Sequence, residues 1–337
     1  MPATIKDVAK YTGLSIATVS KYLNGKRVLE KNKILIDEAI EALNFKVNEM
    51  ARGLKTNRSM TVGILIPSLD NTFFTNIISH VENILIQHRY STIICDYRED
   101  PKLAEEKLNF LINKMVDGII MVPKSANIDS INQVIKKGIP VVFIDRLLKE
   151  VKCDVILSDN LNASYDAVEQ LIIRGHKRIG IICGPKDIYT SQERLKGYLR
   201  VHKDYALNIE KELVLFGNYD MESGYQLLIH LVEMDNPPSA VFVTNYDMTL
   251  GAIMAINEKG IKVPDQLSII GFDNIHLAKI VNPPLSIVVQ PMKEIGEKAA
   301  QVLLSRLHGE NKGDCAVYRL KTEVLIKDSI KAINNQN

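Results

Sequence analysis

Several features that would identify other classes of protein are missing from this 337-residue sequence. No run approaches the ~18 apolar residues of a membrane-spanning helix, and the N-terminal segment is not apolar, so we expect neither a membrane protein nor a signal peptide. The four cysteines, Cys95, Cys153, Cys183 and Cys315, are far apart and lack the spacing of metal ligands. We therefore expect buried, reduced thiols in a cytoplasmic protein that holds no metal.

Motifs that serve nucleotide-dependent and hydrolytic enzymes are also missing. The sequence contains neither a Gly-x-Gly-x-x-Gly turn nor a phosphate-binding loop. It has no Gly-x-Ser-x-Gly elbow, and its seven histidines form no i, i+4 pair that could ligate a metal. An enzyme is therefore the poorer interpretation, no cofactor is expected, and a binding protein is the better interpretation.

The whole chain has little excess charge of either sign, but its first part has an excess of positive charge. The net charge is only +2, which by itself suggests no nucleic-acid partner. Residues 1–60 nevertheless carry 11 basic and 6 acidic residues, a net charge of +5, and the remainder carries a net charge of −3. A basic segment beside a faintly acidic body is the asymmetry expected of a protein with a polyanionic partner.

Apolar spacing predicts three short helices within residues 4–46. The first follows Thr4, which forms a near capping box with Asp7, and it ends at a Thr-Gly-Leu turn. The second spans residues 16–23 with Ser15 as its cap. The third covers about 32–43, and its apolar positions are Ile34, Leu35, Ala39, Ile40 and Leu43.

From residue 61 the pattern changes to short β-branched runs that alternate with amphipathic helices. Such nearly continuous apolar runs are typical of strands covered on both faces of a parallel sheet. Nine runs are many for one small sheet, so we expect an α/β body of two Rossmann-like lobes. The expected strands are 62–66, 92–95, 118–122, 141–144, 155–157, 179–183, 240–243, 269–272 and 287–289.

The first two helices and their glycine turn form a helix-turn-helix pattern, whose second helix would enter the DNA major groove. Ile16 and Ala17 offer apolar contact, such as with a thymine methyl group, whereas Lys21 could bond guanine or a phosphate. Hydroxyl and amide side chains that could bond phosphates and fix the register are Thr4, Ser15, Thr18, Ser20 and Asn24. From spacing alone, a small three-helix bundle without a DNA role stays open.

The order of these motifs resembles the lactose/purine-repressor (LacI/GalR) family of bacterial transcription regulators. The resemblance rests on residues 4–9, 13–15, 18–25, 39–48 and 51–56, and it extends to about residue 329. It implies a helix-turn-helix head at 1–46, a hinge at 47–60 and an effector-binding, dimerising body at 61–330. The body would resemble a periplasmic sugar-binding protein, with an N-lobe of about 61–160 and 291–322 and a C-lobe of about 161–290 and 323–330.

Two local features of this sequence refine the resemblance. Leu29 stands where the family usually has a serine cap, which leaves the start of the third helix open, with Asn32 as a substitute cap. In the family the hinge becomes helical only on operator DNA, where a leucine from each of two copies enters the minor groove. The matching leucine is Leu54, with Arg52 and Lys55 as phosphate ligands. A mere linker at this position stays open.

Several segments that follow expected strands match the ligand-binding positions of the family. The resemblance assigns the effector site to Ser68, Phe73, Phe74, Asp145, Arg194, Tyr219, Asn245 and Asp273. A guanidinium with five fixed donors, carboxylate acceptors and aromatic faces together suit a polyol, so we favour a sugar or sugar derivative over a purine. Two alternatives stay open. Phe74 could belong to the hydrophobic core, and Arg194 and Asp273 could pair with each other without a ligand. Tyr246 replaces the family's usual acid.

The resemblance therefore implies a sequence-specific transcription regulator, expected to be a repressor, whose operator affinity is controlled by a small ligand between the lobes. A homodimer is expected because two heads read the two half-sites of a palindromic operator. The segment after residue 329 is too short for the coiled coil that would make a tetramer. Three alternatives stay open: a co-repressed, purine-repressor-like regulator, a catabolite regulator that also binds a phosphocarrier protein, and a solute-binding sensor without operator function.

Overall fold

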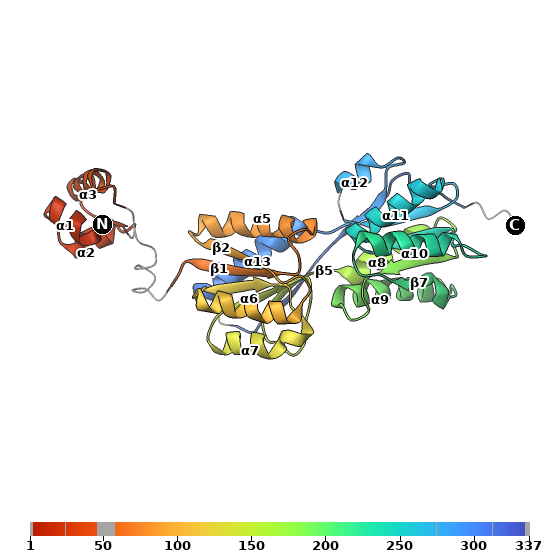
Figure 1. The fold of residues 1–337 in the computed structure, drawn as a ribbon, viewed down its shortest axis with the longest axis horizontal. Helices are drawn as coiled ribbons and strands as arrows, with labels where there is room; N and C mark the ends of the chain where they lie inside the picture. Colours follow the sequence, from red (N-terminus) through yellow and green to blue (C-terminus); the bar gives the residue numbers. More distant parts are fainter. Residues whose placement is uncertain (1–2, 24, 46–57, 274, 312, 334–337) are drawn as a thin grey trace. The chain divides into compact units, whose positions relative to one another are not determined.

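The computed structural model describes residues 3–23, 25–45, 58–273, 275–311 and 313–333 (Figure 1). The chain divides into two compact units, one made of Met1–Thr61 with Met115–Asp117 and the other of Val62–Lys114 with Gly118–Asn337. The first contains the helical head, and the second contains the α/β body.

Three helices form the head: α1 (Ile5–Thr12), α2 (Ile16–Leu23) and α3 (Glu30–Ala42). The first ends at Gly13, whose φ of 67° lies in the left-handed region that favours glycine. The carboxylate of Asp7 accepts hydrogen bonds from the backbone N–H of Thr4 at 2.8 Å and from its hydroxyl at 2.7 Å. These two bonds hold the pKa of Asp7 below its usual value. The small core of the head consists of Val8, Ala9, Val19, Ile36 and Ala39.

The third helix differs from the expectation in its start and in its buried face. It begins at Glu30, directly after Leu29, whose side chain makes no capping hydrogen bond. Asn32 therefore lies inside the helix, and the proposed substitute cap is wrong. Ile34 and Leu35 are 53% and 41% exposed, while Ile36 is fully buried. In a run of three apolar residues, spacing to the next turns does not by itself decide which one faces the core.

The body contains two six-stranded sheets. The first has the order β11-β5-β4-β3-β1-β2 and the second the order β12-β10-β9-β8-β6-β7. The first sheet comprises β1 (Thr61–Ile66), β2 (Ser91–Asp96), β3 (Gly118–Met121), β4 (Val141–Ile144), β5 (Asp154–Ser158) and β11 (Val317–Leu320). The second comprises β6 (Ile179–Cys183), β7 (Val214–Phe216), β8 (Ala240–Val243), β9 (Ser268–Phe272), β10 (Ser286–Val289) and β12 (Glu323–Leu325). The central strands pair in parallel, and β12 joins β10 in antiparallel fashion.

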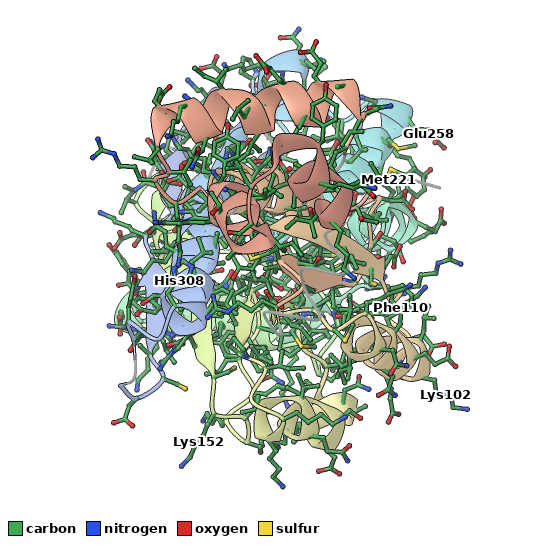
Figure 2. All side chains as sticks on the ribbon, turned by 90° about the vertical axis from the view of Figure 1, so that its left-hand side faces the viewer. Lys102, Phe110, Lys152, Met221, Glu258 and His308 are labelled. Atoms are coloured by element: carbon green, nitrogen blue, oxygen red, sulfur yellow. The ribbon has the colours of Figure 1, made fainter. Side chains whose placement is uncertain are left out.

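Helices cover both faces of each sheet, as the near-continuous apolar strands require (Figure 1). The first sheet lies between one helix layer of α5 (Thr72–Gln87) and α13 (Met292–Leu307) and another of α6 (Pro101–Asn113) and α7 (Ile128–Lys136). The second lies between α8 (Asn160–Ile172) with α9 (Tyr189–Asp204) and α10 (Met221–Val232) with α11 (Tyr246–Lys259), and α12 (Ile275–Ile280) precedes β10. Short 3₁₀ turns occupy Ser125–Asn127 and Lys211–Leu213. Charged side chains such as Lys102, Lys152 and Glu258 point outward (Figure 2).

All nine expected strands are present, and three further strands were not expected. The three are β7, β11 and β12, which have three or four residues each and are only partly buried. All three lie at sheet edges, where one side of the strand faces solvent and a continuous apolar run is not needed. The predicted fold class, a helical head and a two-lobed α/β body, is confirmed.

The chain passes between the two sheets at three places. It leaves the first sheet after β5, returns after β10, and crosses again between β11 and β12, which are separated only by Lys321 and Thr322. We use N-lobe for the part of the body built on the first sheet and C-lobe for the part built on the second. These crossings bring the carboxyl ends of the parallel strands of both lobes toward one another, where ligands of such sheets bind.

The cysteines agree with the expectation at three positions and not at the fourth. All four are free thiols; Cys95, Cys153 and Cys183 are buried, but Cys315 is exposed. Cys315 precedes the edge strand β11, which has no neighbour on its outer side to cover it. Within the described ranges, no helix is long and apolar enough to cross a membrane, and no cluster of side chains has the composition of a metal site.

Candidate functional site

The head presents the expected DNA-contacting residues at the start of α2. Ser15, Ile16, Ala17 and Lys21 are exposed, whereas Val19 on the opposite side of the helix is fully buried. This division leaves the first turn of the helix free to contact another molecule while one valine anchors the helix to the head.

A side-chain cap fixes the first turn of α2. The hydroxyl of Ser15 accepts a hydrogen bond from the backbone N–H of Thr18 at 3.2 Å and lies 2.9 Å from the hydroxyl of Thr18. Thr18 and Ser20 are half-buried, and Thr4 is exposed at the start of α1. The other expected DNA-contacting residues, Asn24, Arg52, Leu54 and Lys55, lie outside the described residues.

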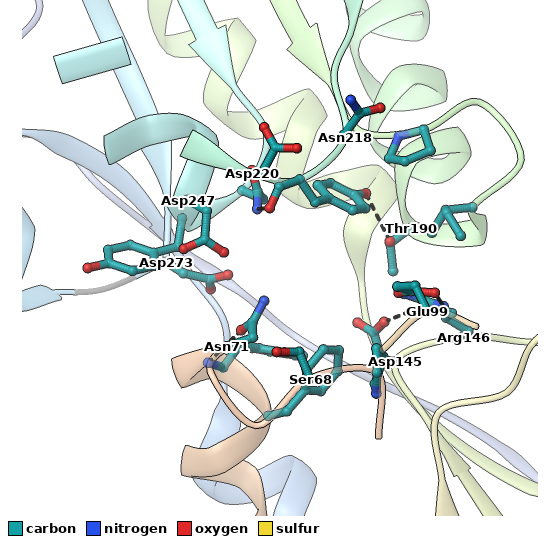
Figure 3. Close-up of a pocket in the computed structure, with 18 of the residues that line it drawn as sticks. Ser68, Asn71, Glu99, Asp145, Arg146, Thr190, Asn218, Asp220, Asp247 and Asp273 are labelled. Atoms are coloured by element: carbon teal, nitrogen blue, oxygen red, sulfur yellow. Dashed lines mark hydrogen bonds and ion pairs between the residues drawn. The ribbon is translucent and has the colours of Figure 1, made fainter. Parts of the chain in front are cut away.

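A cavity of about 490 Å³ lies within the body, at the carboxyl ends of strands from both lobes (Figure 3). Its walls come from loops after β1, β2, β3 and β4 on one side and after β6, β7, β8 and β9 on the other. The structure brings all eight expected ligand residues to this cavity: Ser68, Phe73, Phe74, Asp145, Arg194, Tyr219, Asn245 and Asp273.

Arg194 is the central cation of the C-lobe wall. It projects from α9, is only 4% exposed, and stacks over the ring of Phe272 with 3.9 Å between the guanidinium carbon and the ring centre. Its Nε donates to the side-chain oxygen of Asn160 at 2.8 Å, and its Nη1 donates to the backbone carbonyl of Thr244. Within the described ranges no ion pair joins Arg194 to Asp273, so the guanidinium is held by neutral acceptors.

Asp273 lies at the end of β9 with a left-handed φ of 62°. Its two carboxylate oxygens accept hydrogen bonds from Nε2 of Gln290 at 3.0 and 2.9 Å. Burial raises the pKa of Asp273 to about 6, although the charge of Arg194 and the bonds from Gln290 oppose that rise. The carboxylate is therefore desolvated and ready to accept a hydrogen bond from a ligand hydroxyl.

Three of the four aromatic residues that line the cavity, Phe73, Phe74 and Tyr219, are among those expected from the sequence, and Tyr246 is the fourth. Phe73 and Phe74 meet edge to face, with 5.1 Å between ring centres, and both are more than 90% buried. Phe74 thus contributes both to the core and to the cavity. The ring of Tyr219 lies against Gly184, where an added Cβ would come within 2.1 Å of a ring carbon. The hydroxyl of Tyr219 lies 3.1 Å from that of Thr190.

The N-lobe wall carries a chain of alternating charges. Asp145 follows β4 with a φ of 68°, and its carboxylate lies 3.5 Å from Nε of Arg146. Arg146 in turn pairs with Glu99 at 2.7 Å, and Lys124 pairs with the same carboxylate at 2.9 Å. Burial raises the pKa of Asp145, opposed by the charges of Arg146 and Arg194. Asn245 caps α11 on the opposite wall and accepts a hydrogen bond from the N–H of Met248 at 3.1 Å.

Sequence reasoning missed part of the cavity lining. The charged or polar residues that it did not select include Asn71, Glu99, Lys124, Arg146, Asp220, Asp247 and Gln290. Arg146 directly follows a selected residue, and Gln290 is the first residue after β10. A search for every polar residue within about three positions of a strand end would have found most of them, because all parallel strands end at the same edge of their sheet.

Comparisons with known proteins agree with both parts of the chain. A model of bacterial regulatory proteins of the lacI family matches residues 4–48, and a periplasmic binding protein-like domain model matches residues 168–330. The HTH-type transcriptional repressor PurR of Actinobacillus pleuropneumoniae serotype 3 (strain JL03) is 34% identical over 338 residues, which cover 98% of this chain and 99% of that protein.

Two solved structures show the same architecture. The Lac repressor dimer bound to operator and the anti-inducer ONPF superposes with a TM-score of 0.88 at 23% identity, covering 98% of this chain and 100% of that chain. A LacI family transcriptional regulator from Enterococcus faecium, solved with bound ribose, superposes with a TM-score of 0.74 at 26% identity, covering 81% of this chain and 100% of that chain. The exposed helix-turn-helix, the cavity between the sheets and these relatives all agree. The chain belongs to the lacI family of bacterial regulatory proteins: it is a DNA-binding transcriptional repressor that a small ligand regulates, and it is not an enzyme.

Proposed function

We propose that this repressor binds a palindromic operator as a homodimer and that a neutral monosaccharide in the cavity releases it. Residues 1–46 are the DNA-binding head, 47–60 the hinge, and 61–330 the effector-binding and dimerising body, with lobe boundaries near 160, 290 and 322. Its place of action is the cytoplasm, where the operator DNA of a bacterium lies.

The chemistry of the cavity wall carries the effector proposal. Carboxylates of Asp145 and Asp273, the side chain of Asn245 and the guanidinium of Arg194 line the cavity together with the rings of Phe73 and Tyr219. A monosaccharide has hydroxyls that donate to carboxylates and accept from a guanidinium, and it has a C–H face that packs on an aromatic ring. The regulator from Enterococcus faecium that was solved with bound ribose has the same fold, which supports this assignment.

The head supports operator binding through an exposed first turn on α2. In the proposed complex, Ile16 and Ala17 contact base edges, and Lys21 contacts guanine or a phosphate. Thr4, Ser15, Thr18, Ser20 and Asn24 bond phosphates. The Lac repressor dimer bound to operator, whose fold this chain shares, offers an analogy for two heads on one DNA site.

The hinge proposal assigns Leu54 to the minor groove and Arg52 and Lys55 to phosphates. An apolar wedge between base steps costs a few kcal/mol of unstacking, which is recovered only where the DNA bends to contact more protein. Leu54→Ala should therefore weaken specific operator binding by at least about tenfold and non-specific binding much less. Equal losses on both DNAs in a gel-shift titration would reject the wedge.

A second effector class has one specific observation in its favour. The relatives at 34% identity over nearly the whole chain are named PurR, which points to a purine-repressor-like protein that a purine base would help to bind DNA. The aromatic rings that line the cavity would stack on a purine. The buried carboxylates of the cavity, however, suit the hydroxyl donors of a sugar better. A catabolite regulator with a phosphocarrier partner has no comparable observation.

A thermal-shift screen separates these candidates. The panel contains neutral pentoses and hexoses, hypoxanthine, guanine, sugar phosphates and sugar acids. A ligand present at 100 times its Kd stabilises the folded state by about 2.7 kcal/mol, which shifts the Tm of a chain of this size by several degrees. We expect one neutral monosaccharide to raise the Tm and to weaken binding to the gene's upstream DNA in a gel shift. A response to purines alone would replace the sugar proposal, and operator binding strengthened by the sugar would replace induction by co-repression.

A further inference from the structure

We propose that Glu99 and Lys124 set the charge selectivity of the effector cavity, and that Glu99 is the positioning residue for Arg146. This rests on the proposed function, because it takes the cavity as the effector site. The consequence is a site that accepts neutral sugars and rejects their phosphate esters and acids.

Three charged residues follow strands of the N-lobe sheet, in which β3 and β4 are neighbours and β1 lies between β3 and β2. Glu99 follows β2, Lys124 follows β3, and Arg146 follows β4. Because these strands lie in one sheet, their carboxyl ends meet at one edge of it, and the side chains of Glu99 and Arg146 lie together there (Figure 3). Glu99 has a left-handed φ of 55°, a conformation that a non-glycine residue adopts only where its surroundings fix it.

One carboxylate pairs with two cations at this edge, and Asp145 beside Arg146 supplies the second negative charge that balances them. Arg146 donates from Nη2 to Glu99 at 2.7 Å and from Nη1 at 3.5 Å, while Nζ of Lys124 pairs with the other oxygen at 2.9 Å and also contacts the Glu99 carbonyl. The Arg146 side chain is 7% exposed and that of Lys124 is 19% exposed. Burial alone would raise the pKa of Glu99, but the two cations outweigh it and hold that pKa below its usual value. The Glu99 carboxylate is therefore ionised at neutral pH.

The pairing leaves little free positive charge for a ligand. Arg146 also faces Asp145 through Nε, and its Nε makes no hydrogen bond within the described structure. The one other described cation of the cavity wall, Arg194, is bonded to neutral oxygens. Burial raises the pKa values of Asp145 and Asp273, and the charge of Arg194 opposes that rise.

Further carboxylates make the cavity acidic. Asp70, Asp187, Asp220 and Asp247 line its mouth, and within the described ranges none of them forms an ion pair. The lining that the structure describes thus contains seven carboxylates and three cations. Burial raises the pKa of Asp247, and the neighbouring charge of Asp220 acts in the same direction. A phosphate or carboxylate on the ligand would be repelled here.

Removing the charge of Glu99 should reverse this preference. In Glu99→Gln, Lys124 and Arg146 lose their shared counter-charge, and a buried arginine beside a lysine is the arrangement that binds phosphate. We expect Kd for a neutral sugar to rise about tenfold, because Arg146 loses its fixed orientation. We expect Kd for the phosphate ester of the same sugar to fall at least about tenfold.

The experiment is isothermal titration of the full-length protein with the neutral sugar found in the screen, with its phosphate ester, and with sodium sulfate as a bare anion. D-ribose and D-ribose 5-phosphate are the first pair. Glu106→Gln makes the same chemical change on the exposed surface of α6, outside the cavity, and should behave as wild type. Glu99→Asp keeps the charge but shortens the side chain, so it should weaken neutral sugar binding while still rejecting the anions.

The outcomes separate this inference from the proposed function. If wild type binds a neutral sugar and Glu99→Gln keeps the same ratio of neutral to anionic affinity, the selectivity inference is wrong and the sugar proposal stands. If wild type binds no sugar, the proposed function fails, and the sulfate titration still decides the charge rule. Should Glu99→Gln not fold, Glu99→Asp carries the test: gain of anion binding there would contradict a role for the carboxylate charge.

Discussion

The head and the body of this repressor prepare their binding residues in opposite ways. In the head, the described residues proposed to contact DNA are exposed or half-buried, and the hydroxyl of Ser15 caps the first turn of α2. In the body, six of the eight residues proposed to contact the effector are buried, and Ser68 and Tyr219 are half-buried. Neighbouring side chains hold the charged groups of the cavity: Gln290 holds Asp273, Asn160 holds Arg194, and Glu99 holds Arg146.

The difference follows from the two partners. DNA is a long polyanion that comes to a convex surface, so affinity depends on charge and on access to the groove. A small ligand is surrounded by its site, so affinity depends on polar groups that are already desolvated and oriented. Substitutions on the surface of the head should therefore weaken operator binding. Substitutions of the residues that hold the cavity side chains in place should weaken effector binding.

The largest effect is expected from a negative charge added to the recognition helix. Ala17→Glu places a carboxylate on the exposed first turn of α2, against the phosphates that flank the major groove. Specific operator binding should fall at least about 100-fold at ~0.1 M salt, while effector binding and Tm stay at the wild-type values. Fluorescence anisotropy with labelled operator measures the loss. Lys211→Glu, a charge reversal on the exposed surface of the C-lobe, should leave operator affinity unchanged.

The next largest effect concerns the effector and not the operator. Asp273→Asn keeps the bond with Gln290 but removes the charged acceptor, so effector affinity should fall about 30- to 100-fold. Because the folded state raises the pKa of Asp273 from 3.8 to about 6, the ionised carboxylate lowers the stability of the unliganded protein above pH 6. The variant should therefore gain on the order of 1–3 kcal/mol in unfolding free energy at pH 7. Unchanged operator binding is the control, and retained induction would contradict the assignment.

The same contrast explains how far sequence reasoning reached. The head could be predicted from one continuous motif, because most of the residues proposed to contact DNA in it lie close together in the chain, at residues 15–21. Its errors, at Asn32 and Ile36, concern one helix face where several apolar residues adjoin. In the body, family motifs located Asp273 and Arg194, but not Gln290 or Glu99, because no local pattern shows which side chains from different strands will face one another.

Effector binding should depend on pH, whereas operator binding should not. We expect this effect to be smaller than that of Asp273→Asn. Asp273 offers a charged acceptor on both of its oxygens only while it is ionised, and its raised pKa is about 6. At pH 5 about one-tenth of the carboxyl groups are ionised, so effector affinity should fall about tenfold between pH 7 and pH 5. Burial also raises the pKa of Asp145, which acts in the same direction. Titration calorimetry across this range measures the effect, and in Asp273→Asn most of the slope should vanish.

The smallest effect tests whether packing or hydrogen bonding holds the aromatic wall. Tyr219→Phe removes one hydrogen bond with Thr190 but keeps the ring against Gly184, so effector affinity should change by less than about threefold. Gly184→Ala makes the opposite change: its Cβ would lie 2.1 Å from a ring carbon, so the ring must move, and effector affinity should fall at least about tenfold. Both variants should bind operator like wild type when no effector is present. If Tyr219→Phe weakened effector binding more than Gly184→Ala did, the hydrogen bond between Tyr219 and Thr190 would hold the ring in place. The inference that packing against Gly184 holds it would then be wrong.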